Sequence, residues 1–258
     1  MQRKPVSWFS VNANTAQSPL RLFVLPFAGG GTAVFRQWSQ RLPGVDVVPI
    51  RLPGREMRIS EPPYSMMEPL IDALATQLQP MLDRPYALFG HSMGALIAYE
   101  LAHRLREAQA PQPLALFASA FRSPERKSRR IPMHNLPSDE LLRELKDYGG
   151  LPDAIFDVPE ILKLMLPTIR ADFSILETYT HRDREPLDLP IHCFHGVDDH
   201  VVMSDEMNGW EHKTRGECRF HEIDGDHFFI ATHEQELLGR IGALLHAAAP
   251  SRAAALRA

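Results

Sequence analysis

Short apolar runs alternate with longer stretches of helical periodicity along this chain, and this alternation constrains the fold more than any other sequence feature. Several of the runs are apolar at nearly every position, which is typical of strands buried on both faces of a sheet. The expected strands are Leu20–Pro26, Val45–Ile50, Tyr86–Phe89, Leu114–Ala118, Ile191–Phe194 and Arg219–Ile223. The expected helices between them are Thr32–Leu42, Met67–Leu82, Met93–Ala108, Ser204–His212 and His233–Ala248. This pattern predicts an α/β fold with a mostly parallel central sheet and helices on both faces.

One interval, from Phe121 to Pro190, breaks the alternation because it contains no convincing strand. Its length of about 70 residues makes a structureless loop improbable in a compact domain. Three helices are expected there, over Asp139–Tyr148 with Ser138 as its N-cap, over Glu160–Leu166, and over about Thr168–Thr180. We therefore predict one domain over residues 1–258, with a helical lid inserted at about 121–185 and a frayed C-terminal tail at about 249–258.

Charge and composition exclude several classes of protein. The 28 Lys and Arg residues against 32 Asp and Glu give a net charge of −4. The protein therefore has no overall positive charge with which to attract nucleic acid. No apolar run reaches the roughly 18 residues of a membrane span, and the N-terminus lacks the features of a signal peptide. Two cysteines, Cys193 and Cys218, are too few for a disulfide scaffold and indicate a reducing compartment. We expect a cytoplasmic protein with no nucleic-acid or membrane partner.

The strongest local motif is Gly-x-Ser-x-Gly at Gly90 to Gly94, which joins an expected strand directly to an expected helix. This context is that of a nucleophile elbow, in which the glycines allow strand and helix to pass closely and the serine hydroxyl is exposed on a strained turn. The alternative is an ordinary glycine-rich turn. We interpret Ser92 as a catalytic nucleophile.

A serine nucleophile needs a histidine base and a carboxylate that orients it. Both are expected after Ser92, in loops that follow strands, because open α/β sheets place their catalytic groups there. His227 follows the last expected strand and is the predicted base, while Asp199 is the predicted acid, favoured over its neighbour Asp198. Other histidines also follow Asp199, but they lie in predicted strands or helices or too close to the acid: His200, His212, His221, His233 and His246.

A tetrahedral intermediate also requires donors for its oxyanion. The backbone N–H of Met93, at the start of a helix, is the first predicted donor. The second is expected from the loop after the first strand, where Ala28 is favoured over Gly29. The glycine run of this loop lacks the spacing of a nucleotide site, and the Asp and His residues near Asp199 lack that of a known metal site. We expect no cofactor and no metal.

Together these motifs resemble the type II thioesterases that accompany nonribosomal peptide and polyketide synthetases, and the resemblance extends from about residue 20 to 245. Seven segments carry it: Pro26-Phe27-Ala28-Gly29-Gly30, Leu52-Pro53-Gly54-Arg55, Phe89-Gly90-His91-Ser92-Met93-Gly94, Leu136-Pro137-Ser138-Asp139, Gly149-Gly150-Leu151-Pro152, Gly196-Val197-Asp198-Asp199 and Asp224-Gly225-Asp226-His227-Phe228. The resemblance implies an α/β-hydrolase with a helical lid, a stand-alone enzyme that hydrolyses aberrant or stalled acyl groups from the phosphopantetheine arm of carrier domains. The family's nucleophile, base and acid fall on Ser92, His227 and Asp199.

Five cations lie close together in the expected lid: Arg122, Arg126, Lys127, Arg129 and Arg130. They belong either to a solvated loop or to a surface that meets an acidic carrier domain or the phosphate of its arm. Two other functions remain compatible with the sequence. One is a small-ester carboxylesterase or lipase on the same fold, and the other is a non-catalytic binding module.

Overall fold

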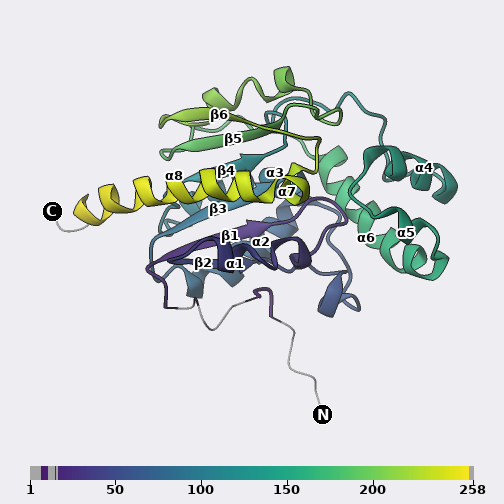
Figure 1. Ribbon diagram of the computed structural model, residues 1–258, viewed down its shortest axis with the longest axis horizontal. Coiled ribbons are helices and arrows are strands. Elements are labelled where there is room, and N and C mark those ends of the chain that lie inside the picture. Colours follow the sequence, from purple (N-terminus) through teal and green to yellow (C-terminus); the bar gives the residue numbers. More distant parts are fainter. Residues whose placement is uncertain (1–6, 11–14, 16, 256–258) are drawn as a thin grey trace, which may run out of the picture.

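A six-stranded parallel sheet forms the centre of the computed structural model, which describes residues 7–10, 15 and 17–255 (Figure 1). The strands are β1 Leu20–Leu25, β2 Val45–Pro49, β3 Tyr86–His91, β4 Leu116–Ser119, β5 Ile191–Gly196 and β6 Cys218–Ile223. They lie in the order β2-β1-β3-β4-β5-β6, and every neighbouring pair is parallel. The α/β fold predicted from the apolar runs is confirmed.

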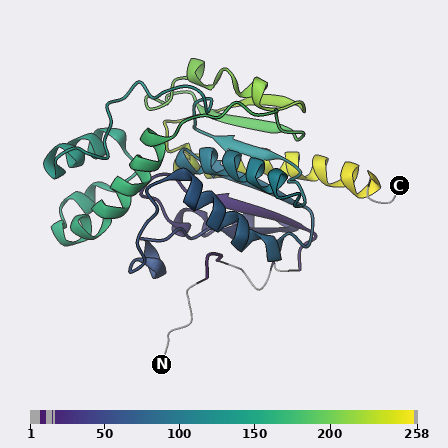
Figure 2. The same cartoon turned by 180° about the vertical axis from the view of Figure 1, so that it is seen from behind.

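Helices cover both faces of the sheet. The helices α1 Trp38–Arg41 and α8 Glu234–Ala255 lie on one face, with α7 Phe229–Thr232, while α2 Met67–Leu78 and α3 Met93–Glu107 lie on the other (Figures 1 and 2). Successive residues of β1 alternate between the two resulting cores: Leu22 and Val24 pack with α1 and α8, while Phe23 and Leu25 pack with α2 and α3. The strand is apolar apart from Arg21, as expected when both faces are buried.

Three helices between β4 and β5 gather beside one end of the sheet: α4 Ser138–Tyr148, α5 Asp153–Phe156 and α6 Pro159–Thr178 (Figures 1 and 2). Residues 121–190 are all described and contain no strand of the sheet. None of the helices in the described part of the chain is long and apolar enough to cross a membrane.

The helices of this insertion differ from the prediction in two ways. The two helices expected over Glu160–Leu166 and Thr168–Thr180 are one continuous helix, α6, with Pro167 inside it. Proline removes one main-chain hydrogen bond, but the buried residues that follow it, Thr168 and Ile169, keep the helix packed against the rest of the protein. Ser138 is the first residue of α4 rather than its N-cap, because Pro137 occupies that position.

Three expected helices outside the insertion also differ. Thr32–Leu42 forms a 3-10 helix at Thr32–Phe35 followed by α1, an arrangement that buries both Phe35 and Trp38. Ser204–His212 is divided into 3-10 helices at Ser204–Met207 and Trp210–Lys213, because Gly209 between them has a φ of 117°. Helix α8 continues to Ala255, into the segment expected to be frayed, and residues 256–258 lie outside the described part. Shorter 3-10 turns occur at Glu56–Arg58 and Gln79–Met81.

Candidate active site

Ser92 lies on a strained turn between β3 and α3. Its φ of 52° and ψ of −118° fall in a region that residues with a side chain rarely occupy. A Cβ atom on Gly90 would lie 1.9 Å from the carbonyl oxygen of Gly94, and one on Gly94 would lie 2.3 Å from that of Leu25. Glycine at both positions therefore lets strand and helix pass closely enough to form the turn.

Ser92, His227 and Asp199 form a continuous chain of hydrogen-bonding contacts. The Oγ atom of Ser92 lies 3.0 Å from Nε2 of His227, and Nδ1 of the same ring lies 2.8 Å from Oδ2 of Asp199. His227 follows β6 and Asp199 follows β5, so the parallel sheet brings their loops to the same edge as the turn that carries Ser92. In this geometry the imidazole can take a proton from the serine hydroxyl while the carboxylate fixes its tautomer.

The carboxylate of Asp199 is buried, and both of its oxygens have hydrogen-bonding partners. Its second oxygen, Oδ1, accepts hydrogen bonds from the backbone N–H groups of Val201 and Val202, at 2.8 and 2.9 Å. Burial acts to raise the pKa of Asp199, but the hydrogen bond and charge of His227, together with these two amides, hold the pKa below its ordinary value. The neighbouring Asp198 is exposed, and its backbone N–H donates to the carbonyl of Gly225. Of the two carboxylates, Asp199 alone contacts His227 in the described structure.

His91, next to Ser92 in the motif, supports the main chain of His227. Its Nε2 lies 2.8 Å from the carbonyl oxygen of His227, and its Nδ1 lies 2.9 Å from Oγ of Ser119. A carbonyl can only accept, so Nε2 carries the proton and Nδ1 accepts from the Ser119 hydroxyl. Burial lowers the pKa of His91 to about 3, which keeps this ring neutral at pH 7.

Two backbone amides are available beside Ser92. Met93 is the first residue of α3, where an N–H has no acceptor within the helix. In the loop after β1, Gly29 N–H donates to Asp172 at 2.7 Å and Gly30 N–H donates to the Phe27 carbonyl at 2.9 Å. The N–H of Ala28 has no acceptor among the residues that the structure describes. Ala28 is therefore better suited than Gly29 to bind an oxyanion.

Tyr148, the last residue of α4, lies against His227 and Ser92. Its ring lies 5.6 Å from that of His227, and its hydroxyl reaches Ser92. Burial raises the pKa of Tyr148, and the contact with Ser92 partly offsets this rise. The exposed fractions are only 3% for Ser92, 5% for Asp199 and 0% for His227, so the insertion shields the site from solvent.

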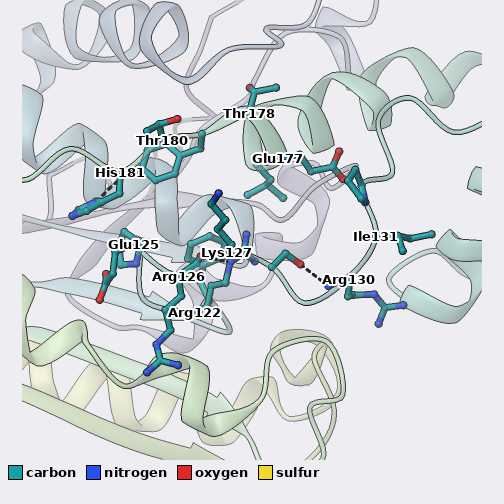
Figure 3. A pocket seen from close by; sticks show the side chains of 16 residues that line it. Arg122, Glu125, Arg126, Lys127, Arg130, Ile131, Glu177, Thr178, Thr180 and His181 are labelled. Atoms are coloured by element: carbon teal, nitrogen blue, oxygen red, sulfur yellow. Dashed lines mark hydrogen bonds between the residues drawn. The ribbon is translucent and has the colours of Figure 1, made fainter.

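The cations that follow β4 divide into two groups. Arg129 is paired with Asp205, and Arg130 is paired with Asp147, each at 2.8 Å, while Arg130 also lies over the ring of Tyr148. The remaining three form no ion pair with a described residue: Arg122, Arg126 and Lys127. These three and Arg130 line a cavity of about 570 Å³. The side chains in Figure 3 come from two segments, the one that follows β4 and the one at the end of α6.

No cluster of metal-ligating side chains occurs among the described residues, and the site itself carries none of the phosphate-binding loops of a nucleotide site. Two other histidines that follow Asp199 have partners elsewhere: His221 lies 3.3 Å from His192 of β5, and His200 lies 3.3 Å from the carbonyl of Asp147. Neither contacts Ser92.

Sequence reasoning missed three residues near the site. Tyr148 precedes Gly149 and Gly150, which belong to the family resemblance, but no sequence pattern gives the tyrosine itself a role. Arg55 stands in the segment Leu52 to Arg55, and Asp172 lies in the middle of α6, far along the chain from the loop that it contacts. The signal for Asp172 in the sequence is a single carboxylate on an otherwise apolar face of the expected helix.

Comparison with known proteins gives matches over nearly the whole chain. The thioesterase domain family model matches residues 20–245. The gramicidin S biosynthesis protein GrsT of Aneurinibacillus migulanus is 36% identical over 233 residues, covering 90% of this chain and 91% of that protein. The structure is similar to that of RedJ, a thioesterase from the prodiginine pathway of Streptomyces coelicolor, with a TM-score of 0.84 and 40% identity over 89% of this chain and 91% of RedJ. BorB, a type II thioesterase from the borrelidin biosynthetic cluster, gives a TM-score of 0.81 and 30% identity over 93% and 97% of the two chains.

Proposed function

The chain belongs to the thioesterase family, and from this premise we propose that it is an editing (type II) thioesterase. It hydrolyses aberrant or stalled acyl groups from the phosphopantetheine arm of carrier domains in nonribosomal peptide or polyketide biosynthesis. The resemblance seen in the seven sequence segments is confirmed by the family match and by relatives named for such pathways. The observation that carries the proposal is the contact chain from Ser92 through His227 to Asp199 in a protein of this family.

The reaction proceeds through an acyl-serine intermediate. His227 takes the proton of Ser92 at Nε2 while Oγ attacks the thioester carbonyl, and Asp199 stabilises the imidazolium that forms. The N–H groups of Met93 and Ala28 bind the oxyanion of the tetrahedral intermediate. The imidazolium gives the proton taken from Ser92 to the departing thiolate, and the neutral His227 then takes a proton from the water that attacks the acyl-serine. It passes that proton to Oγ of Ser92 as the acid is released.

The leaving group suits an enzyme with broad substrate tolerance. A thiol has a pKa near 8.5, so the thiolate leaves far more readily than the amine released by a protease. Protonation of the leaving group by His227 is consequently less critical, and less of the rate depends on holding one particular acyl chain in place. This is compatible with the removal of varied aberrant acyl groups.

The insertion over residues 121–185 acts as a lid in this proposal. Tyr148 lies against His227 and Ser92, and α4 carries it. An acyl group on a carrier arm reaches Ser92 only when this side chain moves aside, because the nucleophile is almost completely buried. The ion pair of Arg130 with Asp147 and the stacking of Arg130 on Tyr148 stabilise the covered state.

The unpaired cations of the cavity face an acidic partner in this proposal. Arg122, Arg126 and Lys127 have no carboxylate partner among the described residues, and the cavity that they line is large enough for a flexible arm. Positive charge at this position favours the approach of an acidic carrier domain and binding of the phosphate of its arm. Arg129 and Arg130 are already paired and contribute less.

Replacement of both unpaired arginines, Arg122→Ala and Arg126→Ala, should raise KM for an acyl-carrier substrate while kcat stays near wild type. We expect an increase of about two- to fivefold for each charge removed, and a weaker dependence of kcat/KM on salt concentration. The matched control is Arg129→Ala combined with Asp205→Asn, which removes a paired cation without changing the local net charge and should leave KM unchanged. An equal rise of KM in the control would show that the cavity cations have no specific role.

The proposed function is tested by comparing one acyl group on two leaving groups. The protein should hydrolyse an acyl group attached to a phosphopantetheinyl carrier with a higher kcat/KM than the same acyl group presented as a simple oxygen ester. An equal or faster rate on the oxygen ester would instead assign the protein to the small-ester carboxylesterases, which share this fold and catalytic arrangement.

A further inference from the structure

A buried ion pair joins the lid helix α6 to Arg55, which lies in the segment between β2 and α2. The guanidinium of Arg55 donates two hydrogen bonds to the carboxylate of Asp172, from Nη1 to Oδ2 at 2.9 Å and from Nη2 to Oδ1 at 2.7 Å. Asp172 is only 1% exposed and Arg55 only 6%. Such paired, planar contacts fix the relative orientation of the two side chains more strictly than a single hydrogen bond does.

Both partners also bind the main chain of the loop after β1. Oδ2 of Asp172 accepts the N–H of Gly29 at 2.7 Å, and Nη1 of Arg55 donates to the carbonyl oxygen of Gly30 at 2.8 Å. Gly29 adjoins Ala28, whose N–H is the proposed oxyanion donor. The pair therefore holds the first and the third of the peptide units that follow this donor, the first through its N–H and the third through its carbonyl.

Further contacts come from the same face of α6 and from the segment around Arg55. Ile169 packs so closely on Gly29 that a Cβ atom there would lie 3.1 Å from its Cγ1. Thr168 donates a hydrogen bond to the carbonyl of Gly54. On the other side of the glycine run, Glu56 accepts from the Thr32 hydroxyl at 2.7 Å. The glycine run has little conformational preference of its own, so these contacts determine its shape.

We propose that Arg55 and Asp172 are positioning residues that hold the loop so that the Ala28 N–H points at the oxyanion. Because Asp172 belongs to α6, the oxyanion site is complete only when this lid helix is seated against the sheet. Closure of the lid over an acyl group and stabilisation of the transition state are thus coupled. The inference rests on the proposed acyl-transfer mechanism, but it concerns any acyl substrate that Ser92 attacks.

Simple structural stabilisation is the competing explanation. A buried ion pair contributes little net stability, because the cost of removing two charges from water offsets their attraction, and an apolar pair of similar volume is often as stable. The two explanations therefore predict different catalytic rates for a variant in which both charges are removed together. An apolar pair would still fill the space between α6 and the loop, but it would leave Gly29 N–H and the Gly30 carbonyl without these partners.

The test is the double variant Arg55→Met with Asp172→Leu, measured on an acyl-N-acetylcysteamine thioester that the wild-type protein hydrolyses. We expect the melting temperature to fall by up to about 10 °C, because two main-chain groups lose their partners, with the protein still folded at the assay temperature. KM should change little, and kcat should fall by about 10- to 100-fold, as when a donor is lost or misplaced. The Ki of an acyl trifluoromethyl ketone, whose adduct with Ser92 carries an oxyanion, should rise by a similar factor. Wild-type kcat and Ki, or a loss of kcat with unchanged Ki, would overturn the inference.

Two further variants make the result interpretable. Arg21→Met with Asp46→Leu removes another buried ion pair, one that lies at the opposite end of β1 from Ser92, and should leave kcat and Ki unchanged. If the double variant at positions 55 and 172 does not fold, Asp172→Asn serves instead, with kcat expressed per active site by fluorophosphonate titration. Asparagine at position 172 keeps one of the two side-chain acceptor oxygens. This variant should therefore lower kcat and raise Ki together, each by about 3- to 10-fold. The proposed function is tested separately, by whether the wild-type protein prefers carrier thioesters. The ratios of kcat and Ki between variant and wild type do not depend on that preference.

Discussion

Replacement of Ser92 by Ala should lower kcat for acyl-thioester hydrolysis by about 10⁴- to 10⁶-fold, the scale on which loss of a triad nucleophile acts in serine hydrolases. The effect is this large because no other described side chain is placed to act as nucleophile: Oγ of Ser92 alone lies within hydrogen-bonding distance of Nε2 of His227. Removing it also prevents formation of the acyl-enzyme. Steady-state kinetics with an acylated carrier measure the effect.

The fold should survive this substitution. Alanine has nearly the same backbone restrictions as serine, and Oγ of Ser92 accepts no hydrogen bond that caps α3. The melting temperature and the affinity for an acyl carrier should therefore remain close to those of the wild type. Full retention of hydrolysis by the variant would contradict the assignment of the nucleophile. Full biological activity without hydrolysis would instead favour a non-catalytic module.

Replacement of Asp199 by Asn should lower kcat by about 10³- to 10⁴-fold. Its Oδ1 accepts hydrogen bonds from the amides of Val201 and Val202, so an asparagine at this position keeps its carbonyl oxygen there. Its NH₂ group then faces Nδ1 of His227 and selects the tautomer that has a proton on Nε2. That tautomer cannot accept the proton of Ser92.

Asp198→Asn provides the matched control, because the two residues are adjacent and carry the same charge. Asp198 is exposed and its only described hydrogen bond uses the main chain, so we expect kcat within about twofold of wild type. Kinetics of the two variants at pH 7 give the comparison. The reverse ranking, with Asp198→Asn the inactive variant, would move the acid to position 198.

Strands β1 to β5 could be predicted from the sequence because each is a mainly apolar run that is buried on both faces. The edge strand β6 is largely exposed, and its apolar pattern is weaker. The helices were less predictable where tertiary contacts override local signals. Pro167 indicated a break, but α6 continues through it, and Gly209 divides a segment that was expected to be one helix. Local sequence does not contain the contacts that decide these cases.

The catalytic site also has residues that could be predicted from the sequence and residues that could not. Ser92, His227 and Asp199 could be proposed from the sequence because each follows a strand, and a parallel sheet brings such loops to one edge. The roles of Asp172 and Tyr148 could not, because both lie in the insertion, where no regular pattern relates sequence position to position in space. Arg55 was recognised in a motif, but only its contact with Asp172 indicates what it does.

Intact-protein mass spectrometry of an acylated carrier, incubated with the wild-type protein and with Ser92→Ala, tests the central claim most directly. With the wild type, we predict that the carrier returns to the mass of its free phosphopantetheinyl form as the acid is released, and that quenched samples contain the acyl group on the peptide with Ser92. With the variant, the acyl group should remain on the carrier. A carrier that stays acylated with the wild-type protein, or acylation of a residue other than Ser92, would contradict the claim.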